Sequence, residues 1–85
     1  MKTAILITPL QWIPNYLAYI PLHLQLVKVV ANKIGNHQLR SGDLLPPISD
    51  LSTASRIAPR IIREAYGELE KLGFIRTAHD HHFIG

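Results

Sequence analysis

The stretch that decides the fold is LPPISDLSTASRIAPRIIREAYGELEKLGFI, residues 45–75. Within it, apolar side chains recur at steps of three and four residues, as on one face of an amphipathic helix. They are Ile61, Ile62, Ala65, Tyr66, Leu69 and Leu72. Pro59 suits the first helical position because its missing N–H would be unpaired there anyway, and Gly73 suits the left-handed position just past the end. The sequence therefore predicts a helix over residues 59–72.

A shorter amphipathic run, residues 47–54, precedes this helix, and residues 55–58 separate the two. Because the connection is so short, the pair predicts a helix-turn-helix. Residues 21–36 predict a further helix that begins at Pro21 and has a broad apolar face.

The residues after Gly73 predict a hairpin. Residues 74–77 and 82–84 predict short strands, and residues 78–81 predict the turn between them. The fold class expected is α+β, mainly α: a winged helix-turn-helix with a three-helix core and a two-stranded wing. This DNA-binding domain would occupy residues 21–85.

Residues 1–20 predict an N-terminal extension with a strand at 4–7 and helical turns beginning at Pro9 and Pro14. One lysine before an apolar run is typical of a signal peptide, but Pro9 interrupts the run and no small-x-small cleavage site follows. A membrane span would need about 20 apolar residues, and the prolines and polar residues break the run, so we expect no membrane partner.

Three aromatic residues in this extension, Trp12, Tyr16 and Tyr19, fall at helical spacing. We expect them to pack against the small core, with Trp12 largely buried. The alternative is an apolar patch that faces a partner, because aromatic side chains are enriched at the centres of interfaces.

Composition limits the possible functions. The 85 residues suffice for one domain, and nine Lys and Arg against six Asp and Glu give a net charge of +3. That mild excess favours a polyanion partner. Cysteine is absent, which excludes disulfides and thiolate metal sites. No nucleophile with a nearby base, glycine-rich phosphate loop or paired carboxylates occur, so we expect neither an enzyme nor a cofactor.

The start of the second helix of a helix-turn-helix enters the major groove, where its first exposed side chains reach base edges. Arg60 and Arg63 lie three residues apart and off the apolar face, so both can point outward and form forked bonds to guanine or phosphate. Ile61 could touch a thymine methyl group. The alternative for Arg63 is an ion pair with Glu64 or Glu70 on the helix surface.

The turn before this helix offers phosphate contacts from Arg56, and the first turn of the preceding helix offers one from Ser49. The residues of the helix-turn-helix that we expect at the DNA are Ser49, Arg56, Pro59, Arg60, Ile61 and Arg63.

The tip of the predicted wing reads His79-Asp80-His81-His82. Imidazoles and a carboxylate this close together can ligate zinc or nickel. However, strand alternation would place His79 and His81 on one face and His82 on the other, so no metal site is expected. We expect His81 and His82 to hydrogen-bond phosphate instead, more strongly when protonated; a turn without a role is the alternative.

The three helices and the first residues of the wing also match a known pattern in register, without insertion or deletion. The matching residues are Pro21, Leu22, Gln25, Leu26, Val30, Ile34, Leu39, Gly42, Leu45, Pro46, Leu51, Arg63, Glu64, Ala65, Tyr66, Leu69, Glu70, Gly73, Phe74 and Ile75. Because of these residues, the segment 21–75 resembles the DNA-binding domain of the GntR family of bacterial transcription regulators, and most closely its small YtrA-like branch.

Several DNA-facing positions differ from the GntR pattern. The family has Pro-Ser-x-Arg where residues 46–49 read Pro-Pro-Ile-Ser, and Ser-Arg-x-Thr where residues 58–61 read Ala-Pro-Arg-Ile. Its Gly-Lys-Gly-Thr wing tip is replaced here at residues 79–82.

The resemblance implies a cytoplasmic transcription regulator, expected to be a repressor, that binds double-stranded DNA as a homodimer. Helix 59–72 would enter the major groove, and the wing, residues 74–84, would lie on the adjacent backbone. The family also implies a region for effector binding or dimerisation after the wing. The sequence leaves open whether residues 1–85 are part of a longer regulator or whether residues 1–20 pair the subunits. No effector is indicated. The alternative function is a winged-helix module that has lost DNA binding and contacts a protein.

Overall fold

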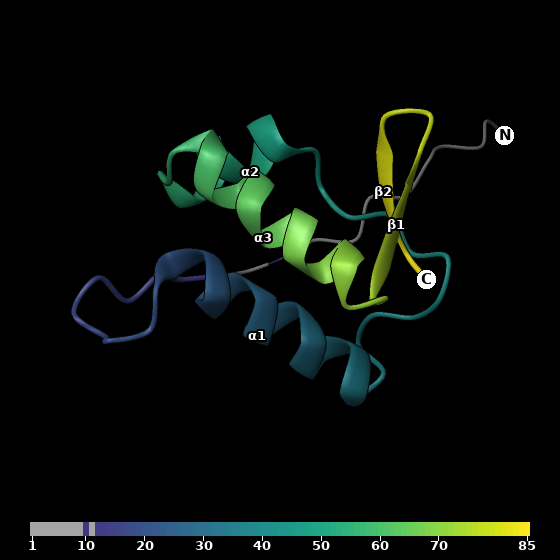
Figure 1. Cartoon of the computed structure of the whole chain (residues 1–85), viewed down its shortest axis with the longest axis horizontal. Coiled ribbons are helices and arrows are strands. Elements are labelled where there is room, and N and C mark those ends of the chain that lie inside the picture. The colour runs from purple at the N-terminus through teal and green to yellow at the C-terminus, as the bar shows by residue number, and fades with distance from the viewer. Residues whose placement is uncertain (1–9, 11) are drawn as a thin grey trace, which may run out of the picture.

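The computed structural model describes residue 10 and residues 12–85 (Figure 1). Their elements are α1 (Leu22–Gly35), α2 (Ile48–Ser55), α3 (Pro59–Lys71), β1 (Ile75–Ala78) and β2 (His81–Ile84). Each end lies within one residue of the predicted position, so the three helices, the turn between α2 and α3 and the two-stranded wing are confirmed. The fold is a winged helix-turn-helix.

Helix α3 is the centre of the molecule, because it contacts α1, α2 and β1 (Figure 1). Its predicted apolar stripe is buried, apart from half-buried Ile61 and from Leu72, which follows the helix and is exposed. The remainder of the stripe packs on buried side chains of α1 and the wing. Seven of these side chains are at most 2% exposed: Leu26, Val30, Ile62, Ala65, Tyr66, Leu69 and Ile84.

The two ends of α3 are built as the sequence predicts. Pro59 is its first residue, preceded by Ala58 in an extended conformation. At the other end Gly73 adopts φ 87°. The Gly73 amide donates to the Glu70 carbonyl (3.0 Å), and the Phe74 amide donates to the Leu69 carbonyl (2.9 Å). This pair of bonds is a Schellman motif, which turns the chain directly from α3 into the wing.

The wing is an antiparallel hairpin with Ile75 opposite Ile84 and Ala78 opposite His81. Its turn has two residues, His79 and Asp80, both with positive φ (52° and 63°). A turn with two left-handed residues matches the twist of the flanking strands. The expectation that His79 shares a strand face with His81 is therefore wrong, because His79 belongs to the turn.

A third segment pairs with the outer edge of β2. Leu44 forms an isolated antiparallel bridge with Phe83. The amide of Ile84 donates to the Asp43 carbonyl (2.8 Å), and the amide of Leu45 donates to the His82 carbonyl (2.8 Å). The segment that leads into α2 is thereby fixed to the wing.

The described part of the N-terminal extension packs on the core through two residues. Leu10 and Trp12 are both 8% exposed and belong to the same buried cluster as the three helices. The burial expected of Trp12 is confirmed. The strand predicted at 4–7 and the helical turn predicted at Pro9 lie outside the described residues, and the division into units 1–20 and 21–85 stays a prediction.

The helical turns predicted from Pro14 are wrong. The Asn15 side chain accepts the amide of Leu17 (3.0 Å). Such a local bond to the backbone competes with helix formation. The Gln25 amide group holds the same loop by donating to the carbonyls of Asn15 (2.9 Å) and Ile20 (2.8 Å).

Because the loop is not helical, its tyrosines do not pack as predicted. Tyr16 is 66% exposed and Tyr19 is fully exposed. The partner-facing alternative therefore remains for these two side chains.

Candidate nucleic-acid interface

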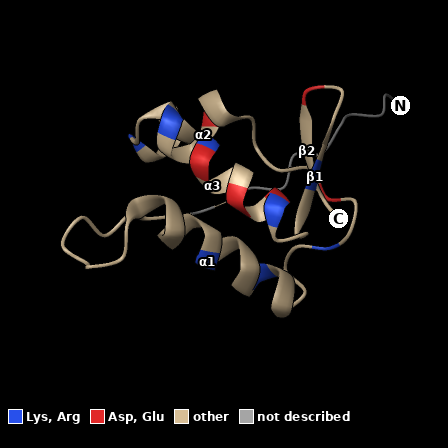
Figure 2. Cartoon of the chain, viewed as in Figure 1, with Lys and Arg blue, Asp and Glu red and all other residues tan. Residues whose placement is uncertain are grey.

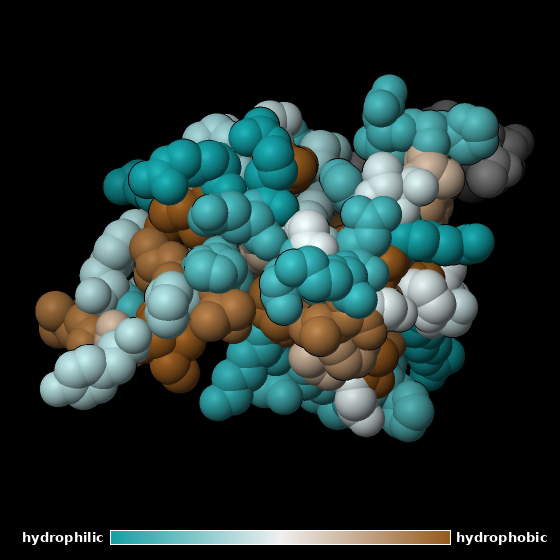
Figure 3. Space-filling view, viewed as in Figure 1, coloured by the Kyte–Doolittle hydropathy of each residue, from teal (hydrophilic) through white to brown (hydrophobic). Residues whose placement is uncertain are grey.

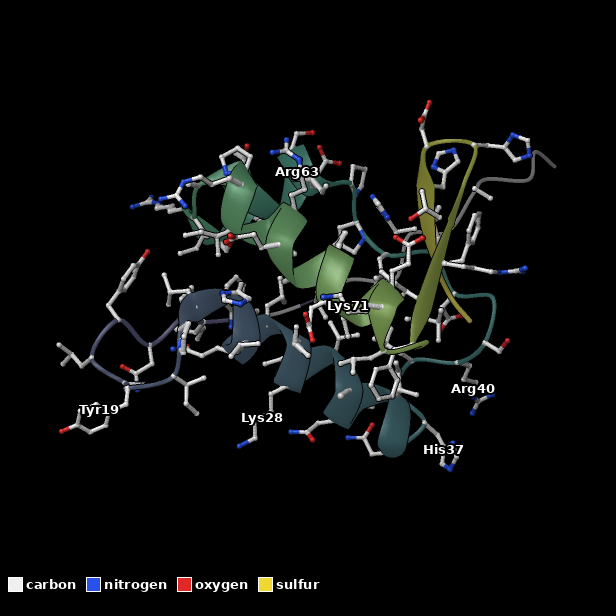
Figure 4. The ribbon with its side chains drawn as sticks, viewed as in Figure 1. Tyr19, Lys28, His37, Arg40, Arg63 and Lys71 are labelled. Carbon is white, nitrogen blue, oxygen red and sulfur yellow. The ribbon has the colours of Figure 1, made fainter. Side chains whose placement is uncertain are left out.

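The start of α3 presents two exposed arginines and uncapped backbone donors. No side chain caps its first turn. Pro59 has no N–H and the Ile61 amide donates to the Ala58 carbonyl (3.0 Å), so the Arg60 N–H and the positive end of the helix dipole face outward. Arg60 and Arg63 are both exposed on this end, and a spacing of three places them side by side. Figure 4 shows Arg63 pointing away from α1, toward solvent. This arrangement suits a phosphate or a base edge.

The alternative ion pairs of Arg63 do not form. Within the described residues one ion pair is present, between Lys71 Nζ and Glu68 Oε1 at 3.9 Å. It lies at the far end of α3, so Glu64 and Glu70 leave the guanidinium of Arg63 free for another anion.

Arg56 occupies the turn between α2 and α3 in a left-handed conformation, φ 58° and ψ 42°. Both sides of the turn are fixed. The Ile57 amide donates to the Ser52 carbonyl (3.1 Å), the Ser52 hydroxyl donates to the Ile57 carbonyl, and the Ile57 side chain is 4% exposed. With Ile57 anchored inward, the neighbouring Arg56 side chain is exposed to solvent.

The other predicted helix-turn-helix residues have different environments. Ser49, in the first turn of α2, and Pro59 are exposed. Ile61 is half-buried and packs against the core, so only part of its side chain remains available for a thymine methyl group.

The structure separates the two predicted wing histidines. His81 is exposed at the start of β2, with its ring 6.2 Å from that of Phe83. His82 is half-buried between the wing and α3. Its ring centre lies 4.8 Å from that of Tyr66 in an edge-to-face arrangement, and its Nδ1 lies 3.1 Å from Thr77 Oγ1.

The environment of His82 favours its neutral form. Burial lowers its pKa, and neighbouring His81 lowers it further, while the Glu70 carboxylate opposes both. A neutral imidazole can offer phosphate a hydrogen bond but no charge. Of the two, His81 has the more accessible ring for such a contact.

The charge distribution on this side of the molecule is mixed (Figure 2). Cations gather at the start of α3, while carboxylates follow along the helix and Asp80 lies at the tip of the wing. Sequence reasoning did not consider Arg76, an exposed cation of β1 paired in register with Phe83. Its position in a predicted strand of the wing could have indicated it as a candidate for contact with DNA.

The described residues offer no group of three or more His, Cys, Asp or Glu side chains placed to hold a metal ion. In the same part of the chain, none of the helices has the length and apolar character that crossing a membrane requires.

Comparison with solved structures gives close matches of the whole fold. YtrA from Sulfolobus acidocaldarius, a GntR-family transcription factor, superposes with a TM-score of 0.80 at 22% identity, covering 92% of this chain and 79% of that one. The chain has the winged-helix fold of this GntR-family protein. The resemblance predicted from the sequence is thus confirmed at the level of the fold.

Two further structures share this winged-helix fold. A transcriptional antiterminator from Listeria monocytogenes EGD-e matches with a TM-score of 0.85 at 22% identity, over 88% of this chain and 57% of that one. A transcriptional regulator from Oenococcus oeni matches with a TM-score of 0.75 at 31% identity, over 82% of this chain and 59% of that one.

Among curated proteins, an uncharacterized HTH-type transcriptional regulator of Bacillus subtilis (strain 168), YhcF, is 28% identical over 57 residues. The match covers 67% of this chain and 47% of the relative, so the match spans about half of that protein's length. No protein-family model matches the chain.

Proposed function

We propose that this winged helix binds double-stranded DNA with the start of α3 in the major groove and regulates transcription, acting as a repressor. The observation that carries the proposal is the exposed group of Arg56, Arg60 and Arg63 around one uncapped helix start. Its relatives are named as transcription regulators, which supports the same function.

The contacts divide by position. Arg60 and Arg63, at the groove-facing start of α3, would reach base edges. Arg56 and Ser49 lie in the turn and at the start of α2, where a phosphate contact positions the domain without reading sequence. Pro59 and the exposed part of Ile61 would approach the groove between them.

The wing would lie on the adjacent backbone, with His81 and His82 contacting phosphate and Asp80 weakening that contact through its charge. A homodimer would place one domain on each half of a two-fold symmetric operator. A chromosomal partner implies the cytoplasm. No effector is proposed.

The proposal predicts different results for two arginines. Arg60→Ala should weaken specific binding by about 1–3 kcal/mol and relax preference at one base pair, since it removes a forked contact to guanine. Arg56→Ala should weaken binding to all sequences alike and make the log-log salt slope shallower by about one unit. Binding would be measured by fluorescence anisotropy at two salt concentrations, with duplexes first selected from a random-sequence pool.

Arg40→Ala is the matched control, because it removes an equal charge from an exposed loop far from the start of α3 (Figure 4). Its affinity and salt slope should stay close to those of the wild type. If the wild type prefers no duplex and Arg60→Ala changes affinity for none, the DNA-binding proposal fails. The alternative, a winged-helix module for a protein partner, would then account for the exposed tyrosines.

A further inference from the structure

An exposed apolar patch covers the loop before α1 and the first turn of that helix. Its side chains are Ile13 (91% exposed), Tyr16 (66%), Leu17 (95%), Tyr19 (105%), Ile20 (44%) and Leu24 (38%). Figure 3 shows hydrophobic surface at this end of the molecule, and Figure 4 shows Tyr19 pointing out into solvent. Residues 13–24 contain no Lys, Arg, Asp or Glu, so this apolar patch suits an uncharged apolar surface rather than a polyanion.

The patch is large for a chain of this size. Six apolar side chains, four of them more than half exposed and two of them tyrosines, offer on the order of 800 Å², the area that each partner buries in a standard protein interface. Contiguous apolar patches beyond a few hundred Å² mark interaction sites on soluble proteins.

Next to the patch lies an open apolar hollow with a volume of about 360 Å³. It is lined by Leu10, Trp12, Ile13, Leu51, Ala54 and Ser55. Ile13 belongs to both the patch and the hollow. A cavity of roughly 150 Å³ holds a benzene ring, so the hollow has room for a leucine or tyrosine side chain.

A protruding loop and a hollow that adjoin each other form a self-complementary surface. A two-fold axis requires this property, because each copy must offer both the inserted side chain and the site that receives it. We propose that two copies of this chain pair through the apolar patch, with Leu17 and Tyr19 of each copy seated in the hollow of the other.

This pairing rests on the proposed function for its purpose, since dimers of helix-turn-helix proteins read two half-sites about one helical turn apart. The Tyr16 hydroxyl donates to the Arg56 carbonyl (3.4 Å), so the patch adjoins the helix-turn-helix. In Figure 4 Arg63 and Tyr19 point to different sides of the molecule. Pairing through Tyr19 therefore leaves Arg63 of both copies free.

Analytical ultracentrifugation of residues 1–85 without DNA tests the pairing independently of operator binding. The wild type should be a concentration-dependent dimer. Leu17→Asp and Ala54→Lys, on opposite sides of the contact, should each raise the dimer dissociation constant by at least about tenfold, equivalent to about 1.4 kcal/mol. The double variant places Asp against Lys across both contacts and should recover most of the loss.

Leu72→Asp is the matched control, because Leu72 is 54% exposed but lies outside the patch and the hollow. It should leave the dissociation constant unchanged, and circular dichroism should show all variants folded.

Three results would overturn the dimer: a wild type that stays monomeric into the millimolar range, an equal effect of Leu72→Asp, or a double variant no better than its parents. A monomer that binds vesicles of phosphatidylcholine through Leu17 would assign the patch to a lipid surface instead. Specific binding of such a monomer to a single half-site would leave the proposed DNA function standing.

Discussion

Arg56 holds a backbone conformation that favours glycine. At φ 58° and ψ 42°, a residue with a Cβ atom is disfavoured by about 1–2 kcal/mol. The turn is held by Ser52 and Ile57, so the structure imposes this conformation on whatever residue follows α2. An arginine here contributes a charge to the proposed phosphate contact at a cost in stability.

Arg56→Gly should therefore raise the free energy of unfolding by about 0.5–1 kcal/mol, the relief of the left-handed conformation less the entropy that glycine adds to the unfolded chain. The same variant should weaken binding to every duplex. Urea denaturation and anisotropy would measure the two effects. Arg56→Ala, which keeps the disfavoured conformation, should lose binding without gaining stability; a Gly variant less stable than the wild type would contradict the argument.

His82 makes the stability of the wing depend on pH. Its pKa in the folded protein is lowered by burial and by His81, with Glu70 opposing, from the ordinary value of 6.5. Below that value the unfolded chain therefore binds a proton more readily than the folded one, so stability should fall as the pH drops from about 7 through the window below 6.5. Above pH 7 both states are neutral at this position, and no change is expected from His82.

Urea midpoints measured across this pH range for the wild type, His82→Phe and His37→Asn would test the assignment. His82→Phe keeps a ring beside Tyr66 and should flatten the dependence. His37 is exposed in a turn with φ 67°, where asparagine is well tolerated, so His37→Asn should keep the slope. An unchanged slope in His82→Phe would assign the dependence to other groups.

At the scale of elements, α3 is well fixed everywhere except at its first turn. The Tyr66 hydroxyl donates to the Pro46 carbonyl (2.8 Å), which ties the middle of the helix to the segment before α2. The Schellman motif closes its last turn. Ala58, with φ −56° and ψ 137°, is in a conformation suited to an N-cap but has no side-chain oxygen.

Ala58→Ser should stabilise the protein by about 1 kcal/mol, because a serine oxygen can accept one of the free N–H groups of the first turn. For a domain of this size that corresponds to a rise of about 4–8 °C in the melting temperature. Calorimetry would measure it. Ala58→Val, which adds bulk without an acceptor, should show no such rise, and an equal gain in both variants would rule out capping as the cause.

The sequence was informative where one local signal determines an element. Apolar periodicity between Pro59 and Gly73 was enough to place α3, and the turn of the wing was predicted to within one residue at each end. The sequence was uninformative where contacts between residues far apart in the chain determine the structure. The pairing of Leu44 with Phe83 and the contact of His82 with Tyr66 both depend on the packed fold. Tyr16 and Tyr19 had helical spacing, but Asn15 and Gln25 hold their loop in another conformation.

The sequence predicted some features of the candidate site and not others. Arg60 and Arg63 follow from their place on an amphipathic helix, and Arg56 follows from its place in the turn. The left-handed backbone of Arg56 and the burial of His82 required the structure, since each is imposed by neighbours that are packed in three dimensions.

Across the whole molecule, residues from the N-terminal segment complete the core of the winged helix. Leu10 and Trp12 belong to one buried cluster with side chains from all three helices and the wing. The chain should therefore unfold as one unit, with tryptophan emission and circular dichroism changing together.

Trp12→Ala should lower the free energy of unfolding by about 3 kcal/mol or more, as removal of a large buried aromatic side chain does. That is a large share of the 5–15 kcal/mol typical of a folded domain. Trp12→Phe, which keeps an aromatic ring in the core, should lose less than half as much. Urea denaturation would measure both; if Trp12→Ala unfolds at the wild-type midpoint, the segment does not contribute to the core.

The pairing of residues 42–45 with β2 also affects how the protein behaves when crowded. An unpaired strand edge is a template on which other chains can add and grow into aggregates. Here the outer edge of β2 is occupied, and β1 offers a short edge of four residues that includes the charged side chain of Arg76. The wing can therefore stand away from the helices, where DNA would meet it, without seeding the assembly of sheets between molecules.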